Sequence, residues 1–82
     1  MNMKTVEKKM IKAGLSKATV KCYMGHARGI VEATGGTVSP KKVKTVILKR
    51  TKGHTAAYFH QATSAATFAF PELKASIRKI KM

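Results

Sequence analysis

Residues 14–36 read GLSKATVKCYMGHARGIVEATGG, and this stretch predicts a long amphipathic helix. Ser16 is a favourable N-cap residue, and the pair Gly35-Gly36 is typical of the end of a helix. Between these signals, mostly apolar residues return every three or four positions, as they do on the buried side of a helix. This buried side is formed by Val20, Tyr23, Ala27, Ile30, Val31 and Thr34.

Two further stripes run along the same helix. A polar stripe is formed by Lys17, Lys21, Arg28 and Glu32, and a small-residue stripe by Ala18, Cys22, Gly25 and Gly29. Each Gly inside a helix costs about 1 kcal/mol relative to Ala, so two of them need a structural reason. We therefore expect either a neighbouring helix or a phosphodiester backbone to approach the small-residue stripe closely.

The rest of the chain also reads as helical, because no run of alternating β-branched residues is long enough to predict a strand. Ser39 and Pro40 are a strong start signal for the third helix, and Pro71 cannot continue the fourth. The predicted ranges are 3–13, 17–34, 40–51, 54 or 55 to 70, and 72–80. The sequence thus predicts an all-α fold, a small bundle of four to five helices, in one domain spanning residues 1–82.

The net charge points to a polyanionic partner. Seventeen Lys and Arg face only three Glu and no Asp, which gives a formal net charge of +14. Such self-repulsion opposes a compact state, so DNA, RNA or an anionic membrane surface is the expected partner. The simpler alternative is a solvated surface with no partner.

The cysteine count and the hydropathy pattern bear on the compartment. Cys22 is the only cysteine, so no internal disulfide can form, which favours a reducing interior. No apolar run approaches the roughly 18 residues that a membrane span needs. We therefore expect a cytoplasmic or nucleoid-associated protein that does not enter a membrane.

Enzymatic chemistry is not predicted. Acid–base and nucleophilic mechanisms need paired carboxylates, or a nucleophile with a base and an orienting acid, and three scattered Glu do not supply them. Cys22 and His26 lie one helical turn apart and could share a metal with His54 or His60. With a single thiol, the favoured alternative is a small buried thiol and a surface imidazole. We expect no metal and no cofactor.

The order of these signals resembles a known family. A basic first helix leads into GLSKATVKCY, helix starts follow at TVSPKKV and near KGHTAAY, and the chain ends in AFPELKASIRKIK before its final Met. This resembles the N-terminal core-binding domain, of SAM-like helical fold, of tyrosine recombinases and phage integrases. The residues that carry the resemblance are Gly14, Leu15, Ser16, Thr19 and Tyr23, then Gly53, Thr55, Phe68, Phe70 and Pro71. The chain departs from the family at Lys41, Lys42 and Lys44, where acidic residues are common.

The resemblance implies a function for the chain. The chain would be a domain that clamps one side of duplex DNA. A catalytic recombinase domain in the same full-length chain would hold the other side and supply the chemistry. Residues 71–82 would then begin the interdomain linker. Oligomerisation on DNA and a viral or plasmid origin are compatible with this reading.

Two groups of residues are the predicted DNA contacts. The first group is Ser16, Lys17, Thr19, Lys21 and Arg28, and the second is Lys49, Arg50, Lys52, His54, Thr55 and Gln61. The first lies at and beyond a helix N-terminus, where backbone N–H groups favour phosphate. Within the second, Arg50 suits guanine and Gln61 suits adenine. The alternatives are that Ser16 only caps, Thr19 only packs, and the second group is solvated surface.

Other functions remain open at this point. A free-standing basic DNA-binding regulator or architectural protein would use the same surface without a catalytic partner. An RNA-binding protein is a further alternative, although the sequence predicts no aromatic-rich stacking surface. A membrane-active cationic helix ranks last, because the aromatic residues are expected to face a core.

Overall fold

The computed structural model describes residues 2–81, so the two ends of the predicted domain, residues 1 and 82, lie outside it. The described part is all-helical and contains no strand. Its elements are α1 (Met3–Lys12), α2 (Lys17–Thr34), α3 (Pro40–Thr51), α4 (Ala56–Ala69), the 3-10 turn η1 (Pro71–Leu73) and α5 (Lys74–Arg78). The predicted all-α bundle is thereby confirmed.

The helix boundaries follow from the capping residues that the sequence predicts. Ser16, Ser39 and Thr55 are the N-caps of α2, α3 and α4, and each side chain accepts a hydrogen bond from the backbone N–H three residues later. Helix α2 ends at Gly35, whose φ of 65° places it in the left-handed conformation that favours glycine. Pro71 follows α4 and opens η1.

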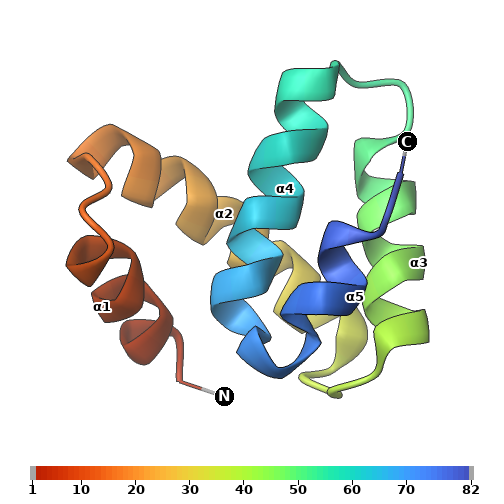
Figure 1. Ribbon diagram of the computed structural model, residues 1–82, viewed down its shortest axis with the longest axis horizontal. Coiled ribbons are helices and arrows are strands. Elements are labelled where there is room, and N and C mark those ends of the chain that lie inside the picture. Colours follow the sequence, from red (N-terminus) through yellow and green to blue (C-terminus); the bar gives the residue numbers. More distant parts are fainter. Residues whose placement is uncertain (1, 82) are drawn as a thin grey trace.

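Helices α2 and α4 form the centre of the bundle and share its most extensive contact, with α1 at one end of the molecule and α3 at the other (Figure 1). The contact is close because α4 is rich in alanine: Ala62, Ala65 and Ala66 are fully buried. On α2, Ala27 and Ile30 are fully buried, whereas the two helical glycines are not. The radius of gyration of 11.5 Å matches the roughly 12 Å expected of a compact chain of this length.

The C-terminal segment packs back onto the bundle. Helix α5 lies against both α4 and α3 (Figure 1), and Leu73, Ile77 and Ile80 join the core. Residues 71–80 therefore contribute to the stability of the domain, whatever follows them. None of the helices within residues 2–81 is both long enough and apolar enough to span a membrane.

Candidate nucleic-acid interface

The small-residue stripe of α2 is not covered by a helix. Ala18, Cys22 and Gly25 are exposed, and a Cβ atom placed on Gly25 would meet no atom within 4 Å. Of the two reasons expected for the glycines, the approach of a neighbouring helix is therefore wrong for Gly25 within residues 2–81. Helix α4 packs instead on the adjacent face of α2, because the larger apolar residues of α2 lie there.

Gly29 has a specific role that the sequence did not reveal. The guanidinium group of Arg50, from the last turn of α3, lies across it, and a Cβ atom at position 29 would be 2.8 Å from Arg50 Cζ. Arg50 Nε donates a hydrogen bond to Nδ1 of His26 (3.3 Å), and Nη2 donates to the Gly25 carbonyl oxygen (3.4 Å). Three positions of α2 thus hold one arginine side chain of α3 in place.

A set of rings and polar groups surrounds this arginine. Tyr58 contacts the ring of His26 edge-on, with centroids 4.7 Å apart, and stacks on His54 at 4.0 Å. Cys22 Sγ donates to Oε1 of Gln61 (3.4 Å). We call this set the Arg50 cluster; its members are Cys22, His26, Gly29, Arg50, His54, Tyr58 and Gln61. It joins α2, the end of α3 and the start of α4.

His26 is the buried centre of the cluster, with 5% of its surface exposed. Burial lowers the pKa of His26, the nearby positive charge of Arg50 lowers it further, a hydrogen bond with Gln61 raises it, and His54 lowers it. The net pKa lies below the ordinary value, so the ring is neutral near pH 7. Because Nδ1 accepts from Arg50, the single ring proton is on Nε2.

These positions correct one expectation. The favoured alternative to a zinc site was a buried Cys22 thiol and a surface His26 imidazole, but the thiol is exposed and the imidazole is buried. The reason is that His26 lies on the side of α2 that meets α3 and α4, whereas Cys22 belongs to the uncovered stripe. No group of three His, Cys, Asp or Glu in the described chain is arranged to hold a metal ion.

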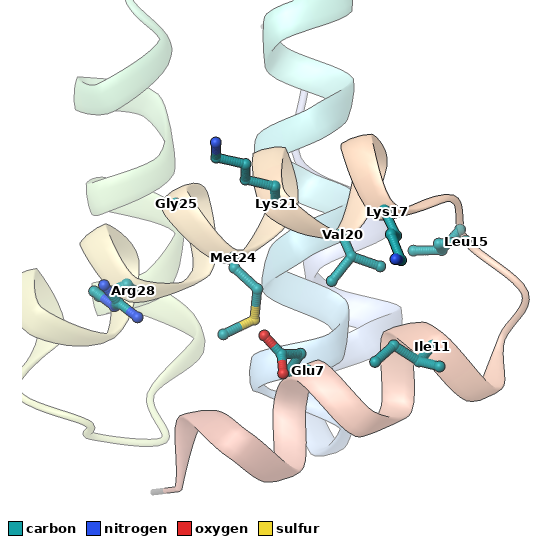
Figure 2. Close-up of a pocket in the computed structure, with 9 residues that line it drawn as sticks. All are labelled: Glu7, Ile11, Leu15, Lys17, Val20, Lys21, Met24, Gly25 and Arg28. Carbon is teal, nitrogen blue, oxygen red and sulfur yellow. The ribbon is translucent and has the colours of Figure 1, made fainter.

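The first predicted group lies along the other edge of the small-residue stripe. Lys17, Lys21 and Arg28, which we call the basic stripe, lie along the edge of α2 that borders the groove between α1 and α2, and the amino group of Lys21 points away from α1 (Figure 2). Ser16 caps α2 and its Oγ donates to Oγ1 of Thr19 (2.8 Å). Both hydroxyls therefore have local partners, although the Thr19 proton is left free to donate.

The structure brings only part of the second group together. Arg50, His54 and Gln61 belong to the Arg50 cluster, while Lys49 and Lys52 are exposed and, among the hydrogen bonds described, make none with it. Thr55 caps α4 by accepting from the backbone N–H of Tyr58 (3.2 Å). Because Oε1 of Gln61 already accepts from Cys22, its amide N–H groups are the part best placed to reach a ligand.

Sequence reasoning did not identify His26 and Tyr58 as parts of the candidate site, nor Gly29 as the position against which Arg50 packs. Tyr58 has core-like spacing, and His26 gave no signal beyond its distance from Cys22. Their roles depend on contacts between different helices, as in the bond from Arg50 to His26, which are 24 residues apart. Comparison of the chain with protein-family models, with curated proteins and with solved structures found no match in any of the three.

Proposed function

We propose that the chain binds duplex DNA through the uncovered side of α2. The observation that carries this proposal is the arrangement of three features: the basic stripe along one edge of the small-residue stripe, the small-residue stripe itself, and the guanidinium group of Arg50 beside Gly25 and Gly29. A bare helix face with several cations along one edge and one cation beside the other suits a phosphodiester backbone, because the backbone can approach closely and meet positive charge.

The members of the interface have different roles in this proposal. Lys17, Lys21 and Arg28 contact phosphates along one edge, and the α2 N-terminus at Ser16 offers backbone N–H groups to a phosphate. Arg50 is held by His26 and Gly25 before DNA arrives, so little side-chain entropy is lost on binding. Two of its five N–H groups have protein partners, so the remaining N–H groups can donate to a phosphate or to a guanine edge.

The resemblance to the core-binding domain of tyrosine recombinases and integrases supports a more specific form of the proposal. In that form the chain clamps one side of a recombination site, and the catalytic domain acts from the other side. This form predicts that a second domain of a recombinase binds the opposite face of the same duplex. Footprinting of the chain on a candidate site, which should protect one face only, tests it.

The main experiment is fluorescence anisotropy with a labelled mixed-sequence duplex, a single strand of the same sequence and an RNA hairpin, each titrated across salt. We expect the duplex to bind most tightly, with a log–log salt slope of about −4 to −7 that corresponds to five to eight phosphates. Equal or tighter binding to RNA or to the single strand would overturn the proposal in favour of an RNA-binding protein.

A matched pair of variants localises the interface. Gly25→Leu places a large side chain on the uncovered stripe, where its Cβ atom would have no protein atom within 4 Å, so the fold should be kept and duplex affinity should fall. Val38→Leu enlarges an exposed side chain in the loop between α2 and α3, outside the proposed interface, and should change neither. A Gly25→Leu protein that folds and binds duplex DNA as tightly as the parent would contradict the proposed surface.

A further inference from the structure

A groove of about 550 Å³ separates α1 from α2 (Figure 2). Its apolar lining consists of Ile11 from α1, Leu15 from the connection, and Val20 and Met24 from α2. Ile11 is 58% exposed, which is unusual for a large aliphatic side chain, and Leu15 and Met24 are half-buried. Contacts with phosphates leave this apolar lining without a role.

The charges around the groove are unequal. The basic stripe follows its α2 side, whereas the α1 side contributes the carboxylate of Glu7, which points toward Met24 in Figure 2. The groove is thus lined by three cations from α2 and one carboxylate from α1, although the amino group of Lys21 points away from α1. An occupant that matches this pattern carries an apolar face and, along the edge next to α2, negative charge.

We propose that this groove binds an amphipathic, acidic α-helix of a partner protein. Apolar side chains of that helix at i, i+3 or i+4, and i+7 would cover Ile11, Leu15 and Met24, and its carboxylates would meet the basic stripe. The basic stripe extends over about 16 Å, since each helical residue rises about 1.5 Å, and this is the length of three turns of a bound helix.

Charge decides against a second copy of this chain as the occupant. A chain of net charge +14 with three carboxylates cannot offer a helix with an acidic edge, and two such chains repel each other. The inference goes beyond the proposed DNA binding and does not rest on it. If both hold, the partner and DNA compete, because they share Lys17, Lys21 and Arg28.

The test uses a synthetic helical peptide of about 15 residues, with Leu at the positions given above and Glu beside them. Backbone amide chemical shifts of the labelled protein should change at Ile11, Val20 and Met24 and saturate with a Kd in roughly the micromolar range. A peptide of identical composition with its Leu residues distributed around the helix, and one with Lys in place of Glu, should both bind far more weakly.

Two substitutions of exposed aliphatic residues complete the design. Ile11→Ser should weaken peptide binding about tenfold, as expected for the loss of a buried aliphatic contact, and leave duplex affinity unchanged. Val38→Ser removes a side chain of similar exposure, 49%, away from the groove and should alter neither. Because both residues lie on the surface, circular dichroism should report the same folded content for both variants.

Three results would overturn the inference: no saturation at about 1 mM peptide, equal binding of the rearranged peptide, or an unchanged Kd in Ile11→Ser. Binding of phosphatidylglycerol vesicles that depends on Ile11, without peptide binding, would instead assign the groove to a lipid surface. Loss of DNA binding alone would leave this inference standing, and loss of peptide binding alone would leave the proposed DNA binding standing.

Discussion

Gly25 and Gly29 are one helical turn apart on α2, yet a methyl group would have opposite consequences at the two positions. At Gly25 it would meet nothing, so Gly25→Ala should raise the free energy of unfolding by about 1 kcal/mol through helix propensity. At Gly29 it would displace the guanidinium of Arg50 from His26. Gly29→Ala should therefore weaken duplex binding about three- to tenfold, part of the energy of a specific arginine contact.

Urea unfolding and fluorescence anisotropy on both variants check this prediction. The Gly25→Ala protein is the control for stability, because it carries the same substitution in the same helix but leaves Arg50 in place. Duplex affinity is compared with the parent protein, and if Gly29→Ala binds duplex DNA as tightly as the parent, the position of Arg50 against Gly29 has no part in binding.

His26 makes folding stability depend on pH. The pKa of His26 is lower in the folded state than its ordinary value of about 6.5. At pH values between the folded-state pKa and 6.5, His26 therefore binds a proton in the unfolded chain but stays neutral in the folded chain. The free energy of unfolding therefore keeps its full value above pH 6.5. It decreases as the pH falls from 6.5 to the folded-state pKa of His26. Protonation of Nδ1 would also remove the acceptor for Arg50 Nε.

Urea unfolding between pH 5.5 and 7.5 measures this dependence. We expect stability to decline toward pH 5.5 in the parent and in His60→Gln, whose imidazole is exposed, and to decline less in His26→Gln. The same slope in His26→Gln as in the parent would assign the dependence to other groups.

The single-residue roles of the candidate site were only partly predictable. Arg50 and Gln61 were expected at the interface from their chemistry alone, and both lie in the Arg50 cluster. The acceptor for Arg50 was not predictable, because His26 is brought to it by the crossing of α2 and α3. Contacts between distant helices depend on packing angles that one sequence does not specify.

At the scale of the helices, local signals were sufficient. Ser39 precedes Pro40, and α3 begins at Pro40 as expected. The ends of α2 and α4 also follow from a glycine and a proline that act within a few residues. What local signals could not supply was the side of α2 on which α4 packs, since both its aliphatic and its small residues offered a plausible contact.

The cap of α3 provides a test at this scale. Lys42 N–H donates to Ser39 Oγ, so Ser39→Ala should lower the free energy of unfolding by about 1 kcal/mol. Ser39→Asp keeps a capping acceptor and should retain most of the stability. Chemical denaturation monitored by circular dichroism measures both, and an unchanged midpoint in Ser39→Ala would show that the first turn of α3 is held by packing alone.

For the molecule as a whole, the charge is distributed widely rather than confined to one face. Every helix except the central α4 carries Lys or Arg, while α4 supplies much of the buried alanine. The bundle therefore has a neutral, tightly packed centre and a cationic periphery. Such a surface attracts polyanions from many directions, and under the proposed function the uncovered side of α2 would select the orientation that binds.

Screening of this charge should stabilise the free protein. At a net charge of +14 the folded state is opposed by self-repulsion, and the Debye length shrinks from about 30 Å at 0.01 M salt to about 8 Å at 0.15 M. The melting temperature should therefore rise with sodium chloride over this range, opposite to the trend expected for duplex affinity. Thermal melts at four salt concentrations test this predicted rise. A melting temperature that stays constant or falls would contradict the self-repulsion argument.

The exposed thiol of Cys22 is a natural site for chemical modification on the uncovered side of α2. It is the one cysteine in the sequence, it lies on the small-residue stripe, and it touches Gln61 at the edge of the Arg50 cluster. A maleimide adduct attached there would cover the middle of the proposed interface and should lower duplex affinity without any engineered residue. Conversely, a bound duplex should shield the thiol. The rate at which Cys22 Sγ is alkylated would then measure how much of the protein is bound to DNA.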